Sequence, residues 1–326
     1  MKSPAFWRPG MGGALALALA PAGCLYGMAT ALRLRFGRTT RPVVPVICVG
    51  NLVAGGAGKT PVVIDLVARL RSRGVNVHVL TRGYGGTVFG PHLVNEADGA
   101  ADVGDEALLL ARTAPTWVAD DRSKGCRHAV QGGAEAIILD DGFQDPSVAK
   151  DLSLVVVDGG FGFGNGYLIP AGPLREPVHV GLRRADAMVV IGGDQHNVAV
   201  RAPAGVAVAR VGAALDPVVR DLADRRVLAF AGIGRPDKFF DALADAGLTL
   251  AETRGFPDHH PYSPAELQRL QDDAALLDAV LVTTEKDLVR LSPADRHGIV
   301  AAPLILDWAD EAVIEGLLDE AMNDGR

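Results

Sequence analysis

Short apolar runs alternate with helix-like segments along most of this chain of 326 residues. The runs are rich in Val, Ile and Leu, as expected for parallel strands that are buried on both faces. They lie at 43–49, 75–80, 136–139, 153–157 and 187–191. Segments with helical periodicity stand between some of them, at 60–73, 104–113 and 122–132. This alternation predicts a doubly wound α/β domain over 39–225.

A second series of elements follows the segment 201–225, which we expect to be irregular. It contains four further apolar runs, predicted as strands at 227–231, 248–254, 280–284 and 299–306. Helical patterns separate and follow them, at 236–246, 263–277, 286–291 and 311–322. The pattern therefore predicts a second, smaller α/β domain over 226–326.

The N-terminal segment lacks charged residues between Arg8 and Arg33 and is rich in Ala, Leu and Gly. Its length could span a bilayer, but it is only weakly hydrophobic, and Pro21 should kink it. The arginines that follow would bind anionic headgroups and stay on the cytoplasmic side. We therefore predict a membrane-associated helix with a basic flank over 1–38. A helix packed on a soluble body and a cleaved signal peptide are the alternatives.

Composition narrows the class of protein. Hydrophobic residues make up 48% of the chain and charged residues 22%, which is compatible with a sizeable core. The net charge of −7 argues against a nucleic-acid partner. The three cysteines are scattered and match no metal motif, which fits a reducing compartment.

A glycine-rich stretch joins the first predicted strand to the first predicted helix. Glycines in such a turn let backbone N–H groups surround a polyphosphate at a helix N-terminus. Lys59 would reach the β- and γ-phosphates of ATP, and the Thr60 hydroxyl would ligate Mg²⁺. Val53 replaces the first glycine of the usual motif, and a glycine-rich turn with an incidental lysine is the alternative. The predicted nucleotide-binding residues are Gly55, Gly56, Ala57, Gly58, Lys59, Thr60 and Pro61.

Acidic residues end the strand predicted at 136–139. Asp140 and Asp141 follow this strand directly, downstream of the phosphate loop. Carboxylates in this position hold Mg²⁺ directly or through water, and two adjacent carboxylates favour a cation beside them. We therefore predict that both contribute to a metal site. An ordinary turn containing Asp and Gly is the alternative.

Other candidate residues lie in loops and at helix ends. Asp105 opens a predicted helix, where it could act in catalysis or only cap the helix. The sequence Asp258-His259-His260 could supply a general base, a metal ligand or exposed surface. Arg175 ends a long glycine-rich loop and could neutralise transferred charge, or it could simply pair within the neighbourhood of Glu176. The segment 81–86 could be a nucleotide loop, a substrate loop or a tight turn.

The ordered series of motifs resembles one family, the tetraacyldisaccharide 4′-kinases, which act on the lipid A precursor of Gram-negative bacteria. The resemblance covers nearly the whole chain. Each motif alone is weak evidence for the family, but the ordered series is highly specific. It rests on the N-terminal apolar segment and on the sequences at 50–61, 81–85, 104–106, 140–144, 173–176, 258–259 and 284–287.

This resemblance implies transfer of the γ-phosphoryl group of ATP to the 4′-hydroxyl of a tetraacyldisaccharide 1-phosphate, with Mg²⁺ as cofactor. It also implies two α/β domains with the active site between them, at the cytoplasmic face of the inner membrane. Asp105 would pair with His259 to activate the hydroxyl. The remaining implied residues are Lys59 and Thr60 at the phosphates, Asp140 and Asp141 at the metal, and Arg175 and Glu176 as residues important for activity.

Two other kinds of protein share some of these features. One is a P-loop ATPase that acts as a membrane-associated switch or partitioning module, although it would not need Asp258 and His259. The other is a soluble small-molecule kinase whose N-terminal helix packs on its body. We expect a monomer that binds an acylated disaccharide lipid and no nucleic acid.

Overall fold

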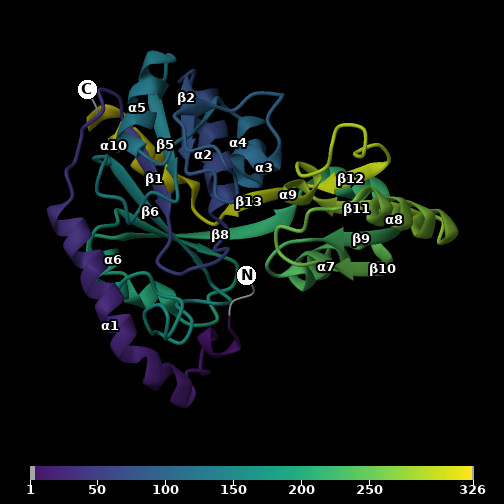
Figure 1. Cartoon of the computed structure of the whole chain (residues 1–326), viewed down its shortest axis with the longest axis horizontal. Helices are drawn as coiled ribbons and strands as arrows, with labels where there is room; N and C mark the ends of the chain where they lie inside the picture. Colours follow the sequence, from purple (N-terminus) through teal and green to yellow (C-terminus); the bar gives the residue numbers. More distant parts are fainter. Residues whose placement is uncertain (1–3, 325–326) are drawn as a thin grey trace.

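The computed structural model describes residues 4–324, which form two α/β units and a long N-terminal helix (Figure 1). The first unit contains a nine-stranded sheet in the order β13-β8-β7-β6-β1-β5-β2-β4-β3. Its strands are parallel except for β3 and β13, which each pair antiparallel with one neighbour. They are β1 (Val46–Gly50), β2 (Val77–Thr81), β3 (His92–Leu93), β4 (Thr116–Val118), β5 (Ala136–Asp140), β6 (Leu152–Asp158), β7 (Ala187–Ile191), β8 (Ala207–Leu215) and β13 (Leu304–Trp308).

Helices cover both faces of this sheet, which confirms the doubly wound α/β fold. One core contains side chains of α2 (Lys59–Ser72), α4 (Asp105–Ala111) and α10 (Glu311–Asp324). The opposite core contains side chains of α5 (Arg122–Gln131) and α6 (Val178–Leu182). Strands β1, β5 and β6 are buried along their whole lengths, which explains their continuous apolar sequences.

The second unit is a smaller parallel sheet in the order β10-β9-β11-β12. It has a helix on each face, and each helix covers its own apolar cluster. The short helix α9 (Glu285–Leu288) directly follows β11. The remaining elements are β9 (Arg226–Ala231), β10 (Thr249–Gly255), β11 (Ala279–Thr284), β12 (Ile299–Ala302), α7 (Pro236–Asp245) and α8 (Pro264–Leu276).

Two predictions about the chain's division were wrong. The segment expected to be irregular contains β8 and a 3₁₀ helix, η3 (Pro217–Leu222). The strand expected at 299–306 is two strands, β12 and β13, which belong to different sheets. Pro303 lies between them and has no N–H to continue a ladder. The second unit therefore ends near residue 302 rather than at 326, because β13 and α10 return to the first sheet.

Helix α1 (Gly13–Phe36) lies alongside the first unit (Figure 1). Pro21, where we expected a kink, stands inside one continuous helix. The helix is long and apolar enough to cross a membrane by length and composition alone, yet one narrow face of small residues packs on the protein. This packed face consists of Ala16, Gly23, Gly27 and Thr30. Large apolar side chains elsewhere on the helix are exposed, namely Leu15, Leu17, Leu25, Met28, Leu32 and Phe36.

Candidate active site

The phosphate loop joins β1 to α2, as the sequence predicted. Gly55 and Gly58 have φ angles of 116° and 84°, a conformation that favours glycine. Gly58 is the N-cap of α2, and Lys59 is the first residue of this 14-residue helix. The loop therefore presents its backbone N–H groups, Lys59 and Thr60 at a helix N-terminus, which is an arrangement that binds anions.

Asp141 connects the phosphate loop to the loop that precedes α6. Its carboxylate lies 3.6 Å from Lys59 Nζ and accepts two hydrogen bonds from the Arg175 guanidinium, at 2.9 and 3.1 Å. Burial alone would raise the pKa of Asp141, but the charges of Lys59 and Arg175 lower it to about 2. The structure thus brings together three of the predicted site residues, Lys59, Asp141 and Arg175.

Asp140 has a different environment at the end of β5. It is buried, and its Oδ1 atom has no hydrogen-bond partner among residues 4–324. Its other oxygen accepts a hydrogen bond of 3.4 Å from the Thr81 hydroxyl. Burial, followed by the charge of Glu106, raises the pKa of Asp140 despite the opposing charge of Lys59. A buried carboxylate oxygen without a donor, with the charge of Lys59 of the phosphate loop acting on it, fits a divalent cation such as Mg²⁺.

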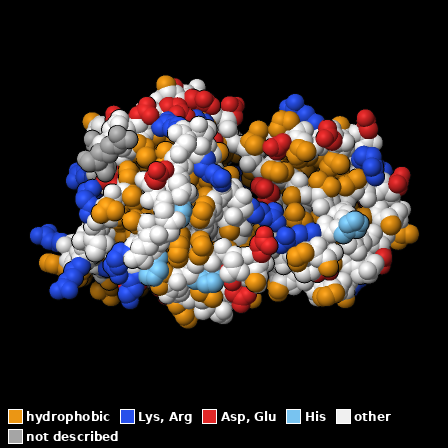
Figure 2. All heavy atoms as spheres, turned by 90° about the horizontal axis from the view of Figure 1, so that it is seen from above, with side chains coloured by type: hydrophobic (Ala, Val, Ile, Leu, Met, Phe, Trp, Pro, Cys, Tyr) orange, Lys and Arg blue, Asp and Glu red, His pale blue; other side chains and the backbone are white. Residues whose placement is uncertain are grey.

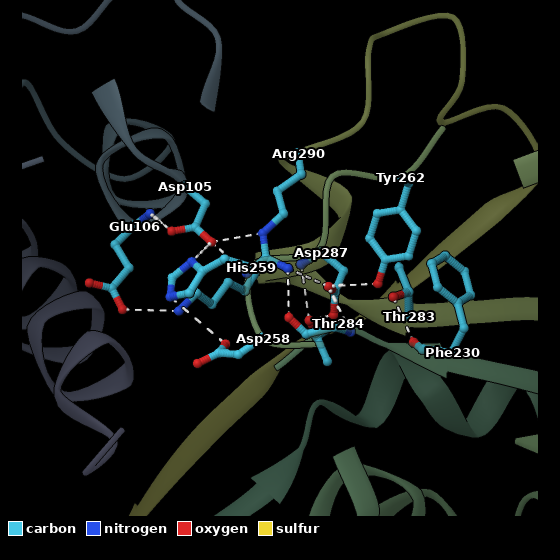
Figure 3. A network of polar contacts seen from close by, with 12 residues as sticks. Asp105, Glu106, Phe230, Asp258, His259, Tyr262, Thr283, Thr284, Asp287 and Arg290 are labelled. Atoms are coloured by element: carbon cyan, nitrogen blue, oxygen red, sulfur yellow. Dashed lines mark hydrogen bonds and ion pairs between the residues drawn. The ribbon is translucent and has the colours of Figure 1, made fainter. Parts of the chain in front are cut away.

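Asp105 of the first unit meets His259 of the second (Figure 3). The distance from Asp105 Oδ2 to His259 Nδ1 is 2.8 Å. Gly104 is the N-cap of α4, so the alternative role of Asp105 as the helix cap is wrong. His259 has a φ angle of 58°, a conformation that non-glycine residues rarely adopt and that often marks functional sites. Its Nε2 atom lies 3.8 Å from Asp258 Oδ1, too far for a hydrogen bond.

Arg290, which follows α9, is a site residue that the sequence analysis missed. Its Nε atom donates to Asp105 Oδ2 at 2.7 Å, and its Nη1 atom donates to Asp287 Oδ1 at 2.7 Å. Burial raises the pKa of Asp105, but the hydrogen bond of His259 and the charges of Lys286 and Arg290 bring it well below its usual range. Asp105 is therefore held as a carboxylate.

The sequence 284–287, part of the family resemblance, builds the support for this pair. Asp287 is fully buried and accepts hydrogen bonds from Tyr262 Oη and from the backbone N–H of Gly232, both at 2.9 Å. Lys286 Nζ lies 3.1 Å from Glu106, the residue after Asp105. Arg290 stands three residues after Asp287, and this spacing was the signal that could have identified it.

His260 and Glu176 have structural partners. His260 Nε2 contacts Glu266 at 3.1 Å, and its ring stacks on Phe256. The geometry thus separates the two adjacent histidines, because only His259 meets Asp105. Glu176, predicted to be catalytic, is buried and bound to Arg184 at 2.6 Å and to Gln144 at 3.0 Å. Its carboxylate supports the loop that carries Arg175.

The loop 81–86 borders the same site. The exposed Tyr84 ring lies 5.9 Å from the His259 ring, measured between centroids. A cavity of about 390 Å³ opens beside it, with Arg82, Phe89 and Asp120 in its walls. Tyr84 is thus shared between the wall of this cavity and the surroundings of His259.

The comparisons with known proteins agree with this geometry. The family model for LpxK, tetraacyldisaccharide-1-P 4′-kinase, matches residues 15–323. The chain is 53% identical to the tetraacyldisaccharide 4′-kinase of Gluconacetobacter diazotrophicus, over 98% of each chain. It is 52% identical to that of Rhodospirillum centenum, over 98% of this chain and 96% of the other.

A solved structure is also similar. It is the crystal structure of LpxK from Aquifex aeolicus in complex with ATP, with a TM-score of 0.76 and 27% sequence identity. The match covers 94% of this chain and 99% of that one. By its matched length, its relatives and its fold, this chain belongs to the tetraacyldisaccharide-1-phosphate 4′-kinase family.

Proposed function

We propose that this protein transfers the γ-phosphoryl group of ATP to the 4′-hydroxyl of a tetraacyldisaccharide 1-phosphate, a step of lipid A biosynthesis. The observation that carries the proposal within the structure is the contact of 2.8 Å between Asp105 and His259. It provides a general base whose two members come from different units of the same chain that carries the phosphate loop. A switch or partitioning ATPase has no need of this base and is not favoured.

In this proposal the phosphate loop binds the nucleotide. Backbone N–H groups of residues 55–60 surround the phosphates, and Lys59 contacts the oxygens of the group being transferred. Thr60 and Asp140 would hold Mg²⁺, which supplies positive charge that favours phosphoryl transfer. Asp141 keeps Lys59 and Arg175 together, so two cations face the position where negative charge develops.

His259 acts as the base toward the acceptor. Because Nδ1 donates its hydrogen to the ionised Asp105, Nε2 is left as the acceptor on the opposite side of the ring. It takes the proton of the sugar hydroxyl as the oxygen bonds to the γ-phosphorus, while the bond to the bridging oxygen of ADP breaks. Asp105 stabilises the resulting imidazolium.

We infer that the enzyme works as a monomer at the cytoplasmic face of the inner membrane. Both members of the base pair come from one chain, so a second copy is not required. Helix α1 packs lengthwise on the protein and exposes its large apolar side chains, which favours a helix lying in the membrane interface over one that spans the bilayer.

The test is incubation with radiolabelled ATP, Mg²⁺ and tetraacyldisaccharide 1-phosphate, followed by location of the label on the product. The wild type should label the 4′ position. His259→Ala should bind ATP but form product at least about 100-fold more slowly, whereas the matched control His260→Gln should retain turnover. A wild-type protein that binds ATP but leaves this acceptor unlabelled would contradict the proposal.

A further inference from the structure

A cavity of about 430 Å³ lies between α1 and the loop that leads into α6. Residues 20–24 of α1 contribute to one wall, and 166–168 and 177–179 contribute to the other. The walls are mainly apolar side chains and backbone, and the volume is within the usual range for small-ligand sites, about 300–1,000 Å³. The proposed reaction uses none of these residues.

Helix α1 is a fixed wall of this cavity. A Cβ atom on Gly27 would lie 2.7 Å from Leu168 Cδ1, and one on Gly23 would lie 3.0 Å from the Leu168 carbonyl oxygen, so glycine at these positions lets the helix approach residue 168 closely. Hydrogen bonds also attach the chain to the first unit just before α1 and near its C-terminal end. Trp7 Nε1 donates to the Pro170 carbonyl at 3.1 Å, and Arg33 donates to the Gln144 carbonyl at 3.0 Å. The cavity thus lies under a helix that is anchored on either side of it.

Two basic side chains also line the cavity, His179 and Arg201. Both residues are exposed, and neither forms an ion pair within residues 4–324. Arg201 lies over the ring of Phe163, with its guanidinium carbon 5.8 Å from the ring centroid. Apolar walls combined with a guanidinium and an imidazole near solvent match a ligand that has an apolar chain and an anionic head.

We propose that this cavity binds one acyl chain of an anionic bilayer phospholipid, with the lipid phosphate at Arg201 and His179. The neighbouring face of α1 exposes Leu17, Leu25 and Met28, which would enter the bilayer and bring the cavity to headgroup level. The inference rests on the proposed membrane location and is independent of the reaction.

The lipid would contact a segment that is bonded to the phosphate loop. Leu174 lines the cavity and forms a β-bridge with Val53. The carbonyl of Pro173 accepts the backbone N–H of Ala54 at 2.7 Å. A bound acyl chain would therefore restrain the backbone on which the nucleotide site is built.

The test uses the full chain on vesicles that contain phosphatidylglycerol with a photoactivatable group in the middle of one acyl chain. Cross-linked peptides are then located by mass spectrometry. We expect cross-links within 20–24, 166–168 and 177–179. Ala20→Phe and Cys24→Phe, which fill the cavity from α1, should abolish these cross-links. Arg201→Gln should reduce them about fivefold, since one basic side chain near an anionic surface contributes that much to binding.

The matched control is Ala18→Phe, on the same helix but outside the cavity, which should cross-link like the wild type. Cross-links confined to Leu17, Leu25 and Met28, or persisting in both cavity-filling variants, would overturn the proposal. The proposal would also be overturned if the tetraacylated acceptor suppressed the cross-links while unlabelled phosphatidylglycerol did not. If the protein fails to bind vesicles, the proposed membrane location is wrong. The proposed kinase activity is tested by a separate measurement, so the two failures can be told apart.

Discussion

Arg290 and Asp105 belong to different units, and two nitrogens of the Arg290 guanidinium donate to one carboxylate oxygen, Asp105 Oδ2. His259 contacts the same oxygen. Arg290 also donates to the carbonyl of Gly232 at 2.7 Å, and this carbonyl accepts the backbone N–H of His259. A single arginine therefore positions both members of the proposed base pair (Figure 3).

Replacement of Arg290 should impair turnover more than nucleotide binding. Arg290→Gln loses charged hydrogen bonds to Asp105, so we expect kcat to fall at least about tenfold with little change in KM for ATP. Steady-state kinetics checks this. Arg296→Gln is the control, because Arg296 donates only to carbonyls at 288, 289 and 291. Equal kcat values for Arg290→Gln and the wild type would rule out the positioning role.

Asp140 should destabilise the nucleotide-free protein at neutral and alkaline pH. Because its folded pKa is raised, the folded state holds this proton more tightly than the unfolded state, and stability falls as pH rises through the raised pKa. Asp140→Asn should therefore raise the melting temperature at pH 8, and the gain should vanish below about pH 4. The same variant should lose Mg²⁺-dependent ATP binding.

Thermal unfolding at the two pH values, without nucleotide, measures the first effect. Calorimetric titration with ATP and Mg²⁺ measures the second. If Asp140→Asn has a lower melting temperature than the wild type at pH 8, the buried Asp140 carboxylate does not destabilise the nucleotide-free protein.

Two glycines of the phosphate loop should respond differently to alanine. Gly58 has a φ angle of 84°, and a Cβ atom there would lie 2.6 Å from Ile191 Cδ1. Gly58→Ala should cost about 1–2 kcal/mol in the free energy of unfolding, from the left-handed backbone alone. Gly56 has open space around it, so Gly56→Ala should leave denaturant unfolding unchanged. Equal destabilisation by both substitutions would contradict the loop geometry.

The exposed apolar side chains of α1 should hold the protein on the membrane. Replacing Leu17, Leu25 and Met28 by Gln together removes apolar area that faces away from the protein. We expect most of the protein to move to the soluble fraction after sedimentation with membranes, with an unchanged melting temperature. Undiminished recovery with membranes would place the binding surface elsewhere.

Local patterns were sufficient to predict most of the fold and the phosphate loop. The buried strands β1 and β5 are continuous apolar runs, and the loop 55–61 carries its signal within a few residues. Strand β13 was assigned to the wrong sheet, because it is a short edge strand with mixed exposure. Its partner β8 is buried only at Ala209 and Val211, and it consists mostly of small residues interrupted by Arg210, so its strand pattern is weak.

The features of the site that could not be predicted from the sequence depend on contacts between distant segments. Arg290 acts on Asp105 across 185 positions of the chain, and no local pattern encodes this meeting. Family resemblance placed Glu176 among the residues important for activity, but only the structure shows its bond to Arg184. His259 and His260 are adjacent in the sequence, and the structure distinguishes them, because His259 contacts Asp105 whereas His260 contacts Glu266.

The central claim is that Asp105 and His259 act as one base, and a double-mutant cycle on single-turnover phosphoryl transfer tests it most directly. With ATP and acceptor saturating, Asp105→Ala and His259→Ala should each slow transfer by about 10²–10⁴-fold. The account predicts that the double variant is hardly slower than the His259→Ala variant, because groups that work as a unit are not additive. Fully additive losses in the double variant would contradict it.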